Sequence, residues 1–274
     1  MKLLKILLSI ILSSMLVFIA CKKEIEPFDD TYHSSLIKPS HEVLQDFYEK
    51  GYTKIDGEIL LMNDTNLVNL HALSNLTSIS RDLIIDGCLE LVSLDDLSNL
   101  QYIGGSLSIA NNDKLTSFHG LNNIGSVHDL DIFNNNSLQN FAGLNNLIKV
   151  ENSAVISYNK NLSSFDGLNN LQTIKMTMLI IDNDKLRNID GLENLMSIIT
   201  LGLIIKRNNT LINIDGLTSL QSVNGISIRS NANLSDFCGL NNLFITYDYS
   251  NNFSVYDNLY NPSKTDILEG NCSQ

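Results

Sequence analysis

A leucine-rich segment is repeated eight times between about Gly57 and Ser250, and this repeat constrains the fold more than any other feature of the chain. Each copy can be aligned on a central leucine, and successive central leucines are 23 to 25 residues apart. These anchors are Leu67, Leu91, Leu115, Leu138, Leu162, Leu186, Leu211 and Leu234. A regular leucine-rich period in the twenties is typical of a solenoid, in which each copy forms one coil that stacks on the next. The repeat therefore predicts one elongated repeat domain.

Apolar residues at fixed distances from the anchor indicate how a coil is built. Residues eight and six positions before it, such as Leu107 and Ile109, are apolar in every copy and predict a short strand with one buried face. Three further apolar columns lie six, nine and twelve residues after the anchor. A spacing of three does not fit a strand, so we expect tight turns or 3₁₀-like corners there.

A polar column and a glycine column complete the coil. Three residues before the anchor, six of the eight copies carry asparagine: Asn112, Asn135, Asn159, Asn183, Asn208 and Asn231. An amide both donates and accepts, so a buried asparagine ladder can satisfy the backbone groups where the strands end. Five residues after the anchor, six copies carry glycine: Gly120, Gly143, Gly167, Gly191, Gly216 and Gly239. We expect a positive φ angle at this column.

The consensus L-x-I-x-x-N-x-x-L-x-x-[FIL]-D-G-L-x-N-L-x-x-I resembles the leucine-rich-repeat superfamily. It is most similar to the receptor L-domain type, found in the ligand-binding lobes of insulin and growth-factor receptors and in bacterial surface proteins. The resemblance implies a right-handed β-solenoid with a parallel sheet on each side, and ligands bound on an exposed sheet face. One departure is that vertebrate L domains carry several disulfides, whereas this array contains only Cys88 and Cys238.

The first 20 residues have the pattern of a secretory signal peptide, with Lys2 and Lys5 before a short apolar run. Phe18–Cys21 resembles a bacterial lipobox, which implies that Cys21 is lipidated and anchors the protein to the outer membrane, at the cell surface or facing the periplasm. An ordinary signal peptide or an uncleaved anchor is the alternative. Residues 21–39 are expected to form a charged tether; Lys22–Asp30 resembles the acidic stretch of Bacteroidota surface lipoproteins, or is a solvated linker.

Both ends of the array are predicted to carry short caps, because an end coil exposes unpaired, apolar surface. Residues 40–56 contain a capping helix with Ser40 as its N-cap and an apolar face of Val43, Leu44 and Phe47, before the solenoid at 57–250. Residues 251–274 form the C-terminal cap, with a short helix after Pro262.

Three cysteines remain if Cys21 is lipidated. Cys88 occupies the ladder column and is expected to be buried. Cys238 lies in the last coil and Cys272 in the tail that folds over it, so a Cys238–Cys272 disulfide would hold the cap. The alternative is three free thiols.

The candidate binding surface is the outward face of the long strands, at positions seven and five before the anchor. A sheet face that meets only water should be polar, yet many of these residues are apolar, and stacking of coils would align them in a continuous stripe. The predicted contact residues are Leu60, Ile84, Phe133, Val155, Tyr158, Leu179, Ile181, Ile204, Lys206 and Arg229. One alternative is that these β-branched residues only stabilise the strands. Another is that a loop or a second copy of the protein covers the stripe.

The sequence offers little for chemistry. The net charge of −12, with 18 basic and 30 acidic residues, does not favour nucleic acid. His71, Asp95 and His119 share one column, but two coils separate the histidines by about 9–10 Å, which is too far for one zinc ion. No nucleophile triad, phosphate loop or CxxC occurs. We therefore expect no cofactor or metal and no enzymatic activity.

The function predicted is a lipid-anchored binding module for a protein or glycan, in an adhesion or receptor-like role. A structural, self-associating envelope protein is the alternative, and a β-helix polysaccharide-active enzyme is less favoured because 23–25-residue coils leave no room for an inserted active site.

Overall fold

The computed structural model describes residues 29–246 and 252–274 of the 274-residue chain. The chain divides into two compact units, Met1–Asp30 and Thr31–Gln274, and all the described helices and strands belong to the second. That unit is mainly β, with parallel strands stacked in sheets and few helices. The prediction of a mainly β fold of stacked parallel strands is confirmed.

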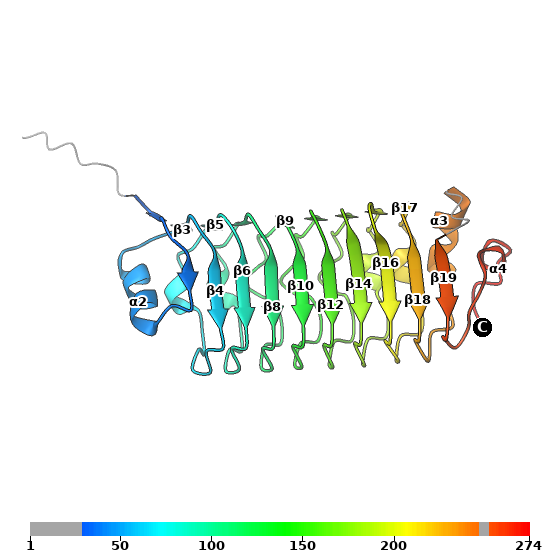
Figure 1. Ribbon diagram of the computed structural model, residues 1–274, viewed down its shortest axis with the longest axis horizontal. Helices are drawn as coiled ribbons and strands as arrows, with labels where there is room; N and C mark the ends of the chain where they lie inside the picture. Colours follow the sequence, from blue (N-terminus) through cyan, green and yellow to red (C-terminus); the bar gives the residue numbers. More distant parts are fainter. Residues whose placement is uncertain (1–28, 247–251) are drawn as a thin grey trace, which may run out of the picture. The chain divides into compact units, whose positions relative to one another are not determined.

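The longest sheet has ten parallel strands in the order β19-β18-β16-β14-β12-β10-β8-β6-β4-β2 (Figure 1). Each copy of the repeat contributes one strand, at the position predicted from the sequence. In β8 and β10 the residues alternate between buried and partly exposed, apart from Ala110, because one sheet face packs on the core. The strands are β2 (Leu36–Ile37), β4 (Ile59–Met62), β6 (Leu83–Asp86), β8 (Leu107–Ala110), β10 (Leu130–Phe133), β12 (Ala154–Ser157), β14 (Thr177–Ile181), β16 (Gly202–Lys206), β18 (Ile226–Arg229) and β19 (Phe253–Tyr256).

Two further sheets consist of two-residue strands. One has the order β1-β3-β5-β7, with β1 (Thr31–Tyr32), β3 (Lys54–Ile55), β5 (Ser78–Ile79) and β7 (Tyr102–Ile103). The other has the order β17-β15-β13-β11-β9, with β9 (Ser126–Val127), β11 (Lys149–Val150), β13 (Thr173–Ile174), β15 (Ser197–Ile198) and β17 (Ser222–Val223). The apolar column twelve residues after the anchor lies in these strands. The expectation of a corner at that column was wrong, because the backbone there is extended and pairs with the neighbouring coil.

At the column six residues after the anchor, the predicted 3₁₀ geometry is present in five copies. These short helices are η1 (His71–Leu73), η2 (Asp95–Leu97), η3 (Asp190–Leu192), η4 (Asp215–Leu217) and η5 (Cys238–Leu240). The third, fourth and fifth copies have turns at this position. Phe118, Phe141 and Phe165 pack against one another in the core of those three copies, with ring centroids 5.8 and 5.1 Å apart.

The buried asparagine ladder predicted from the sequence is confirmed. In a typical rung, Asn159 Oδ1 accepts from the backbone N–H of Asn135 at 3.0 Å, and its Nδ2 donates to the carbonyl of Ile132 at 3.0 Å. The ladder starts at Cys88, whose N–H donates to Asn112 Oδ1, and ends at Asn258, one coil beyond the predicted array. Each amide joins two coils, so the ladder fixes their register at the strand ends.

The glycine column is explained mainly by close approach of the coils. Gly120, Gly143 and Gly167 have φ near +105°, as predicted. The other three glycines have no such φ, so the expectation of positive φ was wrong for them. At Gly191 a Cβ would lie 2.0 Å from the carbonyl oxygen of Phe165 in the preceding coil. The column therefore excludes side chains because the backbones touch there.

The N-terminal end of the second unit is more ordered than the sequence indicated. Helix α2 (His41–Glu49) begins at the predicted N-cap, and Ser40 Oγ accepts from the N–H of Val43. Leu44 and Phe47 are buried, but Val43 is 41% exposed, so its assignment to the apolar face was wrong. Strands β1 and β2 precede the helix and pair with β3 and β4. The tether assigned to residues 21–39 is therefore too long, because its last residues belong to the sheets.

The C-terminal end also extends the sheet. Strand β19 adds a parallel strand after residue 250, where the sequence placed only a cap. Helix α3 (Asn241–Thr246) was not predicted, whereas α4 (Lys264–Leu268) lies where a closing helix was expected and is capped by Ser263. The structure joins Cys238 to Cys272 in a disulfide. No helix in the described part of the chain is long and apolar enough to cross a membrane.

Candidate binding face

The outward face of the ten-stranded sheet carries two rows of side chains in register. The first outward row is Ile37, Leu60, Ile84, Ser108, Asp131, Val155, Leu179, Ile204, Ser227 and Ser254. The second outward row is Met62, Asp86, Ala110, Phe133, Ser157, Ile181, Lys206, Arg229 and Tyr256. The β pairing thus brings together side chains that lie more than 20 residues apart in the sequence.

Nine of the ten residues predicted to contact a ligand lie in these rows and are half-buried. They are Leu60, Ile84, Phe133, Val155, Leu179, Ile181, Ile204, Lys206 and Arg229. The apolar stripe is not continuous, however, because Ser108 and Asp131 separate Ile84 from Val155 in the first row. Ala110 and Ser157 are buried, so they add no exposed surface to the second row. The face therefore has an N-terminal apolar segment and a larger one centred on Leu179.

Asp131 is the polar group between these segments. Burial raises the pKa of its carboxyl to about 6, and the nearby charge of Asp129 acts in the same direction. Its neighbours in the first row are Ser108 and Val155, neither of which supplies a positive charge. A carboxyl in this position is costly to ionise.

Tyr158, the tenth predicted residue, lies just beyond the second row, in a turn with φ +58°, and is 52% exposed. The next two coils place Asp182 and Arg207 at the same position, also with positive φ. Arg207 pairs with Asp182, and its Nε donates to Asp182 Oδ1 at 2.6 Å. The hydrogen bond from Arg207 lowers the pKa of Asp182, and a hydrogen bond with Tyr158 adds to this effect. This turn column was not predicted from the sequence.

A signal for the turn column was present in the sequence. Four residues before the anchor, most copies carry asparagine, aspartate or glycine, the residues that adopt the left-handed conformation most readily. The corresponding positive φ angles occur at Asn63, Gly87, Asn111 and Asn134. In two adjacent coils the amides also pair outside the core, since Asn134 Nδ2 donates to Asn111 Oδ1.

Two cations lie side by side near the C-terminal end of the second outward row. Lys206 is the register partner of Arg229, so their Cα atoms are about 4.8 Å apart. Arg229 Nη1 donates to the hydroxyl of Tyr256 at 3.0 Å, and its guanidinium lies 5.8 Å from the centre of that ring. Within residues 29–246 and 252–274, neither cation forms an ion pair with a carboxylate. Like charges directly opposite one another destabilise a sheet.

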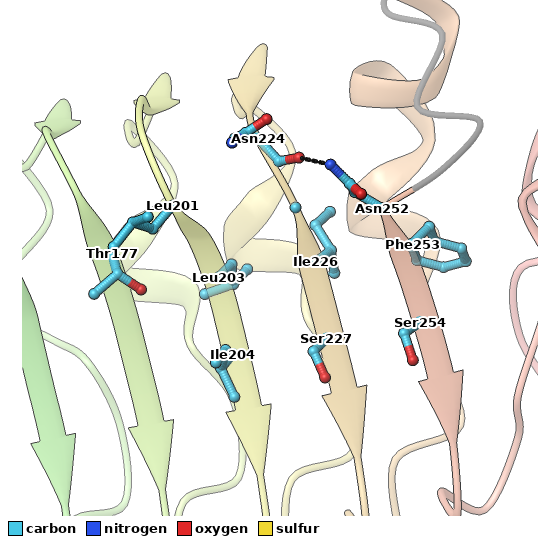
Figure 2. Close-up of a pocket in the computed structure, with 11 residues that line it drawn as sticks. Thr177, Leu201, Leu203, Ile204, Asn224, Ile226, Ser227, Asn252, Phe253 and Ser254 are labelled. Atoms are coloured by element: carbon cyan, nitrogen blue, oxygen red, sulfur yellow. Dashed lines mark hydrogen bonds between the residues drawn. The ribbon is translucent and has the colours of Figure 1, made fainter.

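A hollow of about 540 Å³ opens beside these cations, at the start of strands β14 to β19 (Figure 2). It is lined by Thr177, Leu201, Leu203, Ile204, Asn224, Gly225, Ile226, Ser227, Asn252, Phe253 and Ser254. Asn252 Nδ2 donates to the carbonyl of Asn224 at 2.9 Å across its upper edge, as Figure 2 shows. Of these residues, Ile204 was predicted from the sequence to contact a ligand, but the hollow itself was not predicted.

The remaining candidates lie elsewhere. Cys21 lies outside the described residues. Cys88 is buried, and burial raises the pKa of its thiol to about 11. His71 lies 3.8 Å from Asp96, and in the part of the chain that the structure describes no three His, Cys, Asp or Glu side chains are grouped to hold a metal ion.

Comparison with known proteins adds no assignment. No protein-family model matches the chain, and no curated protein matches it.

Proposed function

We propose that this protein is a lipid-anchored recognition module of the bacterial cell envelope, which binds a protein or a glycan through the outward face of its ten-stranded sheet. In this proposal the protein binds its ligand and does not catalyse a reaction. It also assigns the repeat array to the leucine-rich-repeat, receptor L-domain-like type of right-handed β-solenoid, with β2 and β19 extending the sheet beyond the eight repeat copies.

The observation that carries the proposal is the apolar character of the outward face. Val155, Leu179 and Ile204 follow one another in adjacent strands, with Ile181 beside them in the second row. All four are half-buried and would lose their remaining water contact under a ligand. Burying apolar surface contributes about 25 cal/mol per Å², and an apolar patch on a sheet face open to water is typical of a recognition surface.

The direct test is a binding screen of the purified protein against arrays of glycans and extracellular-matrix proteins, with Leu179→Asp beside the wild type. We expect saturable binding that Leu179→Asp abolishes. The matched control is Ile212→Asp, which places the same charge at a 51% exposed isoleucine outside the two outward rows. Binding that survives Leu179→Asp, or that Ile212→Asp abolishes equally, would remove the outward face from the proposal.

The anchor is a separate part of the proposal, and it is supported by the lipobox pattern that ends at Cys21. We expect wild-type cells to incorporate an alkyne-tagged palmitate into the protein and to retain it in the outer-membrane fraction. Cys21→Ala should abolish both results. Label that persists in Cys21→Ala would show that lipid attachment occurs elsewhere.

A second candidate function, self-association, is favoured by the distribution of charge along the same face. Asp86 and Asp131 lie in its N-terminal half, whereas Lys206 and Arg229 lie towards its C-terminal end. Two copies packed face to face with their coils in opposite order would bring acidic ends against basic ends. Sedimentation equilibrium tests this arrangement: a concentration-dependent dimer that Phe133→Asp dissociates would favour self-association over ligand recognition.

A further inference from the structure

The hollow at the C-terminal end of the sheet face has a specific cause in the sequence. A third outward row begins the long strands, and in the seventh and eighth copies it contains glycine, at Gly202 and Gly225. Thr177 pairs with Gly202 on one side, and Asn252 follows on the other. Gly225 lines the hollow, and its missing side chain leaves a depression between these polar groups. Gly202 is buried outside the lining, where a Cβ would lie 2.2 Å from the carbonyl oxygen of Gly225. Earlier copies carry Glu58, Asp82, Ser106, Asp129 and Ser153 at this position.

The hollow presents hydroxyl and amide groups that are available to a ligand. Ser227 and Ser254 are register partners, and no hydrogen bond from either hydroxyl occurs within the described residues. The amide nitrogens of Asn224 and Asn252 are engaged with backbone carbonyls, which orients their side-chain oxygens but leaves those oxygens as acceptors. A ligand rich in hydroxyl groups would satisfy all four side chains.

Apolar groups complete the lining. Leu201 is 59% exposed at the upper edge, and Ile204 lies in the first outward row beside Ser227 (Figure 2). Apolar side chains next to hydroxyls and amides match a sugar ring, which has C–H faces and polar edges. An extended peptide would instead satisfy its backbone along a sheet edge, and the hollow lies on the sheet face.

The pair of cations lies within reach of the same ligand. Lys206 and Arg229 are each two residues beyond the hollow, on the strands that carry Ile204 and Ser227, a distance of about 6.6 Å along the strand. Neither forms an ion pair with a carboxylate in the described part of the chain, although the charge of Lys206 interacts favourably with Asp182. Tyr256 orients the guanidinium of Arg229. An anionic group on a ligand would relieve the repulsion between the two cations.

We propose that the hollow over Gly225 and the Lys206–Arg229 pair form one binding site for a carboxylated glycan, with sugar hydroxyls in the hollow and a sugar carboxylate at the cations. This inference rests on the proposed recognition function and names its ligand class. The chain has a net charge of −12, so the attraction for an anionic ligand comes from the cation pair and not from the charge of the whole protein.

The test uses the full chain purified in mild detergent and measures affinity by isothermal titration calorimetry. The probes are tetragalacturonic acid and 3′-sialyllactose, which are carboxylated, maltotetraose, which is neutral, and a tetraglutamate peptide. We expect at least one carboxylated sugar to bind about tenfold or more tightly than maltotetraose, since hydrogen bonds to charged groups are among the strongest available. Tetraglutamate should bind weakly, because it cannot use the hydroxyls of the hollow.

Variants locate the site. Lys206→Gln combined with Arg229→Gln should lower affinity for the carboxylated sugar about tenfold or more. The control, Lys149→Gln with Lys175→Gln, changes the net charge equally on the side of the five-stranded sheet of short strands and should leave affinity unchanged. Gly225→Leu should block the hollow while retaining both cations. A Cβ there meets its nearest neighbours at 3.5 Å, so the fold tolerates it.

Each outcome decides the proposal. Failure of both carboxylated sugars to bind, equal binding of tetraglutamate, or binding that survives the cation variant would overturn it. The recognition function is judged separately: a protein or neutral glycan whose binding Leu179→Asp abolishes would preserve that function while removing the carboxylated-glycan site. Circular dichroism of each variant shows whether the fold is intact.

Discussion

Replacing Asn159 with leucine tests whether the buried ladder holds the coils together. Asn159 is fully buried. Its Oδ1 is the acceptor for the N–H of Asn135 at 3.0 Å, and its Nδ2 donates to the carbonyls of Ile132 and Ser157, both at 3.0 Å. Leucine has a similar shape but forms none of these bonds. The N–H left without an acceptor costs about 1–3 kcal/mol, and each lost Nδ2 bond adds about 1 kcal/mol, so we expect a loss of about 4 kcal/mol.

The matched control is Asn170→Leu, at an exposed asparagine whose Nδ2 donates to the carbonyl of Asn145 at 2.6 Å in the preceding coil. Water can replace that bond, so the cost should be below about 1 kcal/mol. Urea unfolding followed by circular dichroism compares the variants. Because coils can unfold locally, amide hydrogen exchange at Asn135 measures the cost at the affected rung. Equal destabilisation by the two substitutions, or unchanged exchange at Asn135, would refute the argument.

Three further substitutions test single features. Cys88→Asn should raise the free energy of unfolding by about 0.5–1 kcal/mol, because an amide is a stronger donor to the carbonyl of Leu61 than the Cys88 thiol, which lies 3.7 Å from it; lower stability in urea would contradict this. Asp131 has its pKa raised from 3.8 to about 6, so the wild type loses stability as pH rises through this range. The free energy of unfolding of Asp131→Asn should therefore equal that of the wild type near pH 4 and exceed it at pH 7 by about 1 kcal/mol, after allowance for solvent screening. Thermal unfolding that showed the same difference between the two proteins at both pH values would refute this. Replacing Cys238 and Cys272 by serine removes a cross-link across 34 residues and should cost about 3–4 kcal/mol; calorimetry showing an unchanged unfolding temperature would argue against a stabilising clamp.

The features predicted correctly depend on a single column of the repeat. Leu107 and Ile109 face the core, and Asn159 lies in the ladder, because every coil repeats the same local pattern. Strands β1, β2 and β19, which were not predicted, lie outside the repeat and lack its local pattern. Strand β19 lacks the leucine columns but continues the ladder through Asn258, which accepts from the N–H of Asn231. Strands β1 and β2 are two residues long, and pairing with the next coil rather than their own sequence makes them strands.

The candidate site was predicted only in part, for a similar reason. Alternation along a strand shows that Leu179 and Ile204 face outward, since the side-chain period of a strand is two. The repeat columns also place them on neighbouring strands, but they do not show how exposed each side chain is. Ala110 and Ser157 face outward and are nevertheless buried, which depends on the packing around them.

The sequence by itself determined the repeat, the strand in each copy, the buried ladder and the residues that face outward, because these follow from local periodicity. Only the tertiary structure decided that β19 continues the sheet beside β18 and that a hollow opens over Gly225. Strand β19 has no anchor leucine, so counting along the repeat does not give its register. Hydrogen bonds between stacked coils fix it, and they form only when the chain is folded.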